Sequence, residues 1–227
     1  FFCALASYST HATWSILGSD TVAGEIGAAS ATCYESFGKV YTDVLNHDDI
    51  YTPIPNASVV LIQQALGIGN SERFGFENIS KLANEKMRAE DILNIGSRHA
   101  PEHQKILNLY NQYGVLVLEG GVATFTGDWA SVGWIAGKHS GVHHEISSKS
   151  LTYQYAAIGN TLSNKKVVMN SAEAFEQPAC DLAERLMNAL EAGQQDEDSL
   201  IGDIRCVQSN IQPNSATEAF IRVERPF

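Results

Sequence analysis

A threonine that directly follows a small residue is the first position in this sequence where chemistry could arise. Thr13 comes after Ala12, at the point where an apolar segment ends and an alternating, strand-like run begins. If a peptidase cut after Ala12, Thr13 would carry a hydroxyl nucleophile and, on the same residue, a free α-amine. The ordinary pKa of that amine, about 7.7–8.0, would let it act as the base for the hydroxyl at neutral pH. The alternative is that Thr13 is an ordinary β-branched strand residue.

The residues before this threonine have the composition that such a cut requires. Residues 1–12 hold an apolar run followed by Thr10 and Ala12, which fit the −3 and −1 positions of a signal-peptidase site. We therefore expect 1–12 to be the C-terminal part of a signal peptide and 13–227 to be a single domain. The protein is then expected to be secreted or periplasmic. A competing cut after Ala6 would leave the threonine internal.

The composition argues against two classes of partner. The chain has 227 residues, of which 44% are hydrophobic and 18% charged, so it can bury a sizeable core. A net charge of −11 and the lack of a basic run argue against binding to a nucleic-acid backbone. No stretch reaches about 18 consecutive apolar residues, so we expect no membrane span.

Hydrophobic patterns predict two hairpins and several helices. Strand patterns flank a Gly-containing turn at 13–17 and 25–32, and flank Glu119-Gly120 at 112–118 and 121–126. Helical spacing predicts helices over 78–87, 89–95, 171–176 and 181–192. Further strands are expected over 58–66, over 155–158 with a turn at Gly159-Asn160, and over 216–223. The polar stretch 37–56 is expected to lie outside the core. This mixture predicts a layered α+β fold.

Four residues close together in the sequence form the best metal candidate: His139, His143, His144 and Glu145. They lie in a Gly/Ser-rich segment without the i, i+4 spacing of a helical zinc site, so a surface loop is the alternative. Gly67-x-Gly69 lacks the rest of a dinucleotide-binding loop, and the nucleophile elbow Gly-x-Ser-x-Gly does not occur. We therefore expect neither a metal nor a cofactor.

Six stretches, taken in their order along the chain, carry a family resemblance: 12–16, 24–30, 123–127, 158–160, 182–193 and 202–206. Together they resemble the prokaryotic family known as domain of unknown function 1028 (DUF1028). That family looks like a branch of the N-terminal nucleophile (Ntn) hydrolases. The resemblance therefore implies a four-layer αββα sandwich whose nucleophile opens a central strand, and Thr13 matches the nucleophile's position.

The resemblance also implies a set of site residues. Recurrent polar positions of the family are matched by Ser30, Gln63, Asn160, Asp203 and Arg205. An oxyanion would be held by backbone N–H groups with Asn160 or Ser30, although Ser30 could equally be a small packing residue. Asp203 and Arg205 either serve the site or form a structural clamp.

The leading hypothesis is an exported hydrolase that cleaves an amide bond in a small molecule, a peptide or a peptidoglycan fragment. The peptidoglycan option comes from relatives that carry an additional peptidoglycan-binding module. The alternative is a non-catalytic cell-envelope binding protein that retains the fold, since a fold does not imply a function. Whether the protein forms a homo-oligomer stays open.

Cysteine pairing is a further expectation. Removal of 1–12 leaves Cys33, Cys180 and Cys206, an odd number that allows at most one intramolecular bridge. The resemblance to exported relatives implies a bridge between Cys33 and Cys206, with Cys180 left over. The alternative is that all three are reduced core residues.

Overall fold

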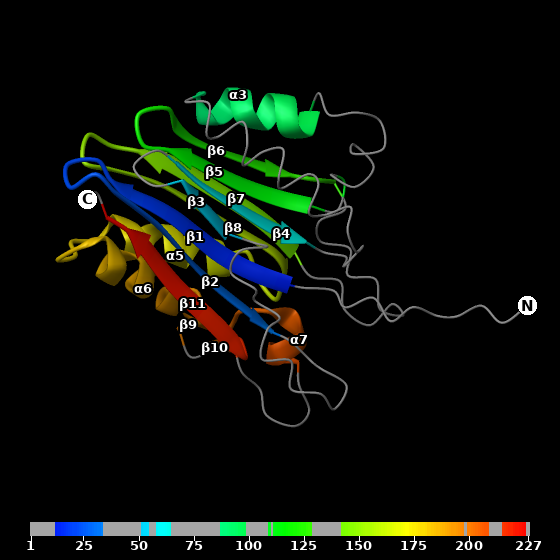
Figure 1. Ribbon diagram of the computed structural model, residues 1–227. Helices are drawn as coiled ribbons and strands as arrows, with labels where there is room; N and C mark the ends of the chain where they lie inside the picture. Colours follow the sequence, from blue (N-terminus) through cyan, green and yellow to red (C-terminus); the bar gives the residue numbers. More distant parts are fainter. Residues whose placement is uncertain are drawn as a thin grey trace, which may run out of the picture.

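Two antiparallel sheets form the body of the protein (Figure 1). The computed structural model describes residues 12–33, 51–54, 58–64, 87–98, 109, 111–128, 142–197, 199–208 and 215–225. Within them, the first sheet contains, in spatial order, β11 (Glu218–Glu224), β2 (Glu25–Cys33), β1 (Ala12–Asp20), β8 (Tyr153–Leu162) and β7 (Val142–Lys149). The second contains β3 (Tyr51–Ile54), β4 (Ser58–Gln64), β5 (Asn111–Val117) and β6 (Gly121–Thr126). The strand β1 is thus the central strand of the first sheet.

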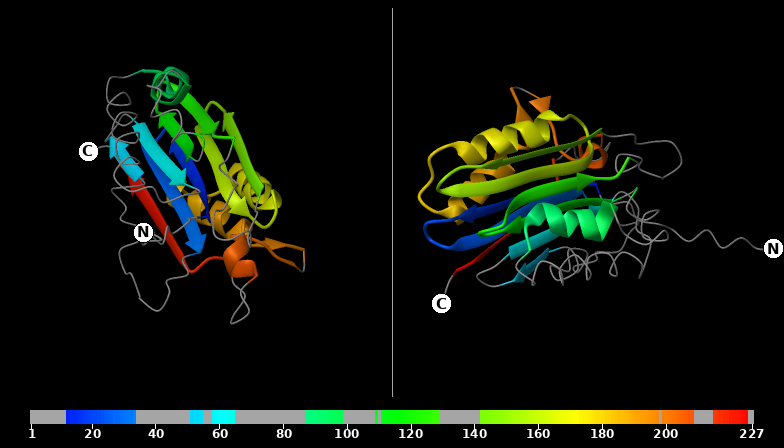
Figure 2. Two further views of the ribbon diagram at one scale, coloured as in Figure 1. Left: turned by 90° about the vertical axis from the view of Figure 1, so that its right-hand side faces the viewer. Right: turned by 90° about the horizontal axis from the view of Figure 1, so that it is seen from above.

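Helices pack on the outer faces of the sheets (Figure 2). The remaining elements of the described residues are α3 (Ala89–Leu93), its π-helical continuation η1 (Asn94–Arg98), α5 (Lys166–Glu176), α6 (Leu182–Ala192), β9 (Gln195–Asp196), β10 (Ser199–Leu200) and α7 (Ile204–Val207). Helices α5 and α6 cover the first sheet, and α3 covers the second through Ile92 and Leu93. This arrangement confirms the expected mixture of helices and strands. Among the described residues, no helix has the length and apolar character to cross a membrane.

The turn between β1 and β2 sets the register of the central hairpin. Asp20 Oδ1 accepts hydrogen bonds of 2.8 Å from two backbone N–H groups of the turn. Gly24 ends the turn with a φ of 72°, a conformation that glycine adopts without strain. The resulting register places Thr13 opposite Thr32. A slip by one residue would move every side chain of the strand to the other face.

Alternation along β1 decides which side chains meet the helices. Trp14 and Ile16 are buried in the core against α5 and α6. Leu17 points the other way and packs with apolar residues of β4 and β5. Because successive residues of a strand point to opposite faces, Thr13 and Ser15 share the face of Leu17 and lie between the two sheets.

The helix α6 follows the sequence pattern closely. Asp181 is its N-cap, and the Asp181 carboxylate accepts a 2.8 Å hydrogen bond from the backbone N–H of Glu184. Leu182, Leu186 and Leu190 form the buried stripe that faces the first sheet. The helix holds the outer face of β1 and β2 in place.

Three local expectations are wrong, each for a physical reason. The stretch 37–56 contains the edge strand β3, and its Pro53 is tolerated there because an edge strand need not use every N–H. Val142–Lys149 forms β7 rather than a loop; as an edge strand it has a neighbour on one side only and needs less apolar sequence. The strand β8 continues past Gly159 to Leu162, because this glycine makes room for close packing rather than a turn. The helix expected over 78–87 lies outside the described residues, apart from Met87.

The predicted disulfide is confirmed. Cys33 at the end of β2 is bonded to Cys206 in α7, with an S–S distance of 2.06 Å and a Cα–Cα distance of 5.6 Å. Cys180 is exposed and is a free thiol, as expected. The bridge therefore ties the end of β2 next to Thr32 to the segment that follows Asp203.

Candidate active site

Thr13 lies in the first sheet between two strands that both present polar residues to it. Its cross-strand neighbours are Thr32 on β2 and Asn160 on β8. Directly opposed residues in antiparallel strands have Cβ atoms about 4.5–5.5 Å apart, so the three side chains are neighbours on one face. Thr13 is only 5% exposed, and its hydroxyl lies 3.2 Å from the Thr32 hydroxyl, to which it donates a hydrogen bond.

A second hydroxyl pair lies one step further along the same face. Ser15 is opposite Ser30, and Ser15 Oγ donates to Ser30 Oγ at 2.7 Å. Ser30 Oγ in turn lies 3.4 Å from the carbonyl oxygen of Trp14. Both serines are buried, and their hydroxyls bond within the first sheet. Ser30 therefore lies on the same face of the sheet as Thr13, but its cross-strand partner is Ser15 and not Thr13.

Asn160 is fully buried beside the backbone of Thr13. The next residue, Thr161, has a φ of 51°, in the left-handed region that β-branched residues avoid. Its hydroxyl lies 3.5 Å from Asn160 Oδ1. Such backbone strain persists only where the surrounding structure enforces it, and it often occurs at functional sites.

Asp203 braces the ends of the two strands that flank Thr13. Its buried carboxylate accepts a 2.7 Å hydrogen bond from the backbone N–H of Cys33. Its backbone forms a bridge with Leu162 at the end of β8 and donates to the carbonyl of Ser215. These contacts favour the structural alternative for Asp203. Arg205 lies in α7, and its side chain is outside the described part of the structure.

The second sheet contributes a polar cluster that the sequence did not reveal. Gln112 Nε2 donates to Thr126 Oγ1 at 2.9 Å and to the carbonyl of His144 at 3.2 Å. Thr126 Oγ1 also donates to a carboxylate oxygen of Glu145. Because His144 pairs with Gly159 in the β7–β8 register, this cluster lies next to the end of β8 that carries Asn160.

Two features of this cluster bear on the sequence expectations. Gln63 pairs in register with Gln112, which places its backbone at the same end of the second sheet. Glu145, which the sequence suggested as a metal ligand, bonds to the Thr126 hydroxyl. No group of three or more His, Cys, Asp or Glu residues that could hold a metal occurs among the described residues. His139 lies outside them.

One signal in the sequence could have identified Thr32. The hairpin has a four-residue turn, so a register that pairs Asp20 with Glu25 also pairs Thr13 with Thr32. The sequence shows the turn without showing where it begins, and the register could not be fixed from it. For the Gln112 cluster no such signal exists, because its members come from three strands that are distant in the sequence.

The chemistry available to Thr13 depends on its own nitrogen. While Ala12 precedes it, this nitrogen is an amide and does not accept a proton at neutral pH. Hydrolysis of the bond between Ala12 and Thr13 would convert it to an α-amine, which can. The Thr13 hydroxyl, the Asn160 amide and the Thr32 hydroxyl would then stand beside this amine on one face of the sheet.

Comparison with known proteins places the chain in a family. The family of unknown function DUF1028 matches residues 13–210. The chain belongs to this family. The crystal structure of a DUF1028 protein from Silicibacter pomeroyi is similar, with a TM-score of 0.63 and 21% identity over 95% of this chain and 74% of that chain. At this identity the likeness is one of fold.

The crystal structure of eukaryotic HslV from Trypanosoma brucei also matches, with a TM-score of 0.47 and 9% identity over 92% of this chain and 99% of that chain. No curated protein matches the sequence. Membership of DUF1028 is thus established, while the family itself has no assigned function.

Proposed function

We propose that this DUF1028 protein is an Ntn-type hydrolase that cleaves an amide bond, with Thr13 as its nucleophile. The fold would be the four-layer αββα sandwich of these enzymes. In this proposal 1–12 is the end of a signal peptide and 13–227 is the mature, single-domain protein. The disulfide between Cys33 and Cys206 supports export, because such bridges persist in oxidising compartments.

The position of Thr13 is the observation that carries the proposal. It lies at the start of the central strand, between a hydroxyl on β2 and an amide on β8, and facing the second sheet. The DUF1028 match begins at this same residue. A threonine with only a structural role in a strand would not need polar neighbours such as Thr32 and Asn160.

The proposed reaction has two halves. Thr13 Oγ1 attacks the carbonyl carbon of the substrate amide while the α-amine of Thr13 takes the hydroxyl proton. The tetrahedral intermediate collapses when that proton passes to the leaving nitrogen, so that the C–N bond breaks and an acyl ester remains on Thr13. Water then attacks the ester, the amine takes a proton from the water, and the acid is released with Thr13 regenerated.

The other residues would support this chemistry. The Asn160 amide is the side-chain donor best placed for the oxyanion, because the Ser30 hydroxyl bonds within its own sheet. Asp203 would act as a positioning residue through its bond to Cys33, and Arg205 follows it in α7. The substrate would be a small molecule or a peptide, including a peptidoglycan fragment. No metal or cofactor has a role in these steps.

Acylation by a β-lactone tests the proposal without knowledge of the substrate. A protein that begins at Thr13 should open the lactone and gain its mass on Thr13, as read by peptide mass spectrometry. Thr13→Ser should retain labelling and Thr13→Ala should lose it. The matched control keeps Ala12 before Thr13, which preserves the hydroxyl and removes the free amine. Loss of this general base should slow acylation by about 10²–10⁴-fold.

The outcomes separate the two hypotheses. Acylation of Thr13 that depends on the free amine supports the hydrolase. Equal labelling with and without Ala12, or none on Thr13, would refute the nucleophile and favour the non-catalytic cell-envelope binding protein. The N-terminus of the protein secreted with its complete leader should be Thr13, and another start would contradict the proposed processing.

A further inference from the structure

A carboxylate on the edge strand β7 lies on the face of the first sheet that also carries Thr13. Glu145 is paired with Ile158 on β8, and Ile158 is paired with Ser15 on β1. Ile158 is buried between the two sheets, so the paired Glu145 side chain also faces the second sheet. The bond of Glu145 to Thr126 in that sheet agrees with this direction. Glu145 and Thr126 each keep part of their surface exposed, so a ligand can reach them.

The register also fixes how far Glu145 lies from Thr13. One strand, β8, separates their two strands, and Glu145 is level with Ser15, which follows Thr13 by two residues. Two strand spacings of about 4.8 Å and a rise of about 7 Å for two residues put the two Cα atoms about 12 Å apart. The side chains shorten this gap from both ends. A group with the length of about two extended residues, about 7 Å, can therefore join them.

Neighbouring side chains orient this carboxylate without neutralising it. The Thr126 hydroxyl donates to one carboxylate oxygen of Glu145. Gln112 Nε2 donates to Thr126 Oγ1 at 2.9 Å, which directs the proton of that hydroxyl toward Glu145. These partners are uncharged, and Glu145 forms no ion pair with any residue that the structure describes. A half-buried carboxylate in this state has lost hydration that no opposite charge replaces.

The same cluster has more acceptors than donors. Gln112 is fully buried, and its Oε1 has no hydrogen-bond partner within the described part of the chain. The amide nitrogen is used by Thr126 and by the carbonyl of His144. The buried oxygen is out of a ligand's reach, but only one hydroxyl separates the Gln112 amide from the carboxylate. Its partial negative charge therefore adds to that of Glu145 and favours a cationic ligand there.

We propose that Glu145 selects substrates whose acyl half carries a cationic group, an ammonium or a guanidinium, at a distance of about two residues from the scissile carbonyl. This inference rests on the proposed role of Thr13. In that reaction the α-amine of Thr13 passes a proton to the leaving nitrogen, so the leaving group lies toward the start of the strand. The acyl group then extends the other way, toward the row of Ser15 and Glu145, where its cation pairs with the carboxylate.

Binding to a protein that begins at residue 13 and carries Thr13→Ala tests this subsite without the reaction. NMR titration compares 6-aminohexanamide with heptanamide, in which a methyl group replaces the ammonium. The amine should bind with a dissociation constant on the order of millimolar, about tenfold more tightly than heptanamide, because it forms a charge-assisted hydrogen bond. Glu145→Gln keeps an acceptor for the Thr126 hydroxyl and removes the charge, so this preference should disappear. Its melting temperature checks that the variant is folded.

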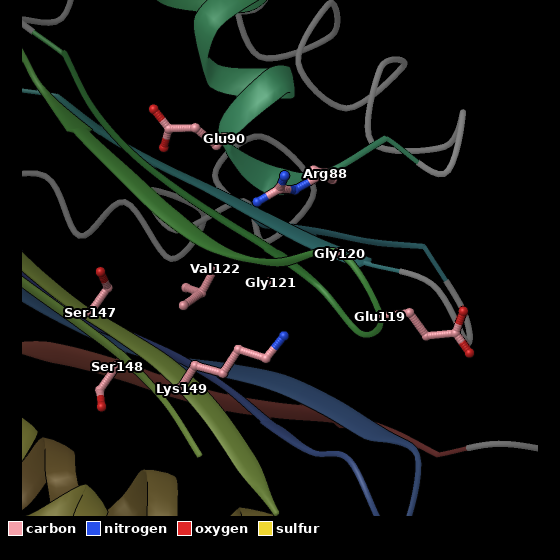
Figure 3. Close-up of a pocket in the computed structure, with 9 residues that line it drawn as sticks. All are labelled: Arg88, Glu90, Glu119, Gly120, Gly121, Val122, Ser147, Ser148 and Lys149. Atoms are coloured by element: carbon pink, nitrogen blue, oxygen red, sulfur yellow. The ribbon is translucent and has the colours of Figure 1, made fainter. Parts of the chain in front are cut away.

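The matched control is a carboxylate at the other end of the second sheet. Glu119 is exposed in the β5–β6 turn, whereas Thr126 ends β6 on the opposite side. Together with Arg88 and Lys149, it lines a pocket of about 490 Å³, and its carboxylate points away from that cavity (Figure 3). Glu119→Gln removes the same charge far from Thr13 and should leave the preference for the amine unchanged.

Two β-lactones connect the subsite to the reaction. One carries a 4-guanidinobutyl group, and the other carries the neutral 4-ureidobutyl group of the same shape. The first should acylate Thr13 about tenfold faster, and Glu145→Gln should abolish the difference. No preference for the cation in either assay, or the same preference in Glu145→Gln, would overturn the subsite. If neither lactone labels Thr13, the nucleophile is refuted, and the binding assay alone decides the role of Glu145.

Discussion

Removing the disulfide between Cys33 and Cys206 should destabilise the protein strongly. The bridge links two residues that are 173 positions apart, so it closes a loop over most of the domain. Breaking it leaves the folded contacts largely in place and frees the unfolded chain. The main effect is therefore on the entropy of the unfolded state.

The magnitude follows from the length of that loop. The chain-entropy model gives about 5 kcal/mol at 25 °C for a loop of this size, and native bridges commonly deliver about 2–4 kcal/mol. A loss of about 3 kcal/mol corresponds to a melting temperature lower by about 6–12 °C in a domain of this length. The hydrogen bond from the Cys33 backbone N–H to Asp203 does not use the sulfur, so it should persist without the bridge.

Urea unfolding of four samples measures the effect. The oxidised wild type is compared with the reduced wild type, which keeps both buried sulfurs, and with the Cys33→Ala, Cys206→Ala double variant. Cys180→Ala is the matched control, because this thiol is exposed and belongs to no disulfide. The reduced protein should lose about 2–5 kcal/mol and the control less than about 0.5 kcal/mol. A loss below about 1 kcal/mol on reduction would refute the loop-entropy reasoning.

Three other predictions rest on single contacts. Gly114→Val should lower the free energy of unfolding by about 1–3 kcal/mol, because a Cβ at this position would lie 2.4 Å from Leu17 Cδ1 in the other sheet. Urea unfolding measures the change. An unchanged free energy of unfolding would mean that the two sheets can move apart here at no cost. Asp181→Ala should cost about 1 kcal/mol by removing the N-cap of α6, and Asp181→Asn should restore most of it, measured in the same way. The pKa of the Cys180 thiol is raised above its ordinary value because it donates a hydrogen bond to the Glu184 carboxylate. The rate of its alkylation by iodoacetamide should therefore rise at a higher pH than the rate for a cysteine with an ordinary pKa. Glu184→Gln should shift this pH–rate profile to lower pH. An unshifted profile would show that the Glu184 carboxylate does not raise the pKa of the thiol.

Sequence patterns predicted those parts of the fold that depend on local chemistry. The strand at Thr13, the hairpin around Glu119-Gly120 and the helix that Asp181 opens follow from alternation, turn residues and capping. The edge strands β3 and β7 were missed. Their pairing partners supply what their own sequences lack, and a neighbour in the sheet cannot be inferred from local composition.

The residue types at the site were visible in the sequence, but their contacts were not. Thr13, Asn160 and Asp203 could be singled out, although 147 positions separate Thr13 from Asn160. Only pairing of β1 with both β2 and β8 makes Asn160 and Thr32 neighbours of Thr13. The hydrogen bond from the Cys33 N–H to the Asp203 carboxylate likewise joins residues that are 170 positions apart, so it forms only in the folded protein.

The sequence by itself determined which residue we propose as both nucleophile and base, because a threonine has that capacity once it becomes the N-terminus, through its own covalent structure. It also determined that only one intramolecular disulfide could form among Cys33, Cys180 and Cys206. The tertiary structure decided what surrounds these groups. Strand order and register bring together side chains that are distant along the chain, and they also place Arg88 and Lys149 around one pocket. Long-range pairing is specified by the packing of the whole core, and no local stretch of sequence contains that information.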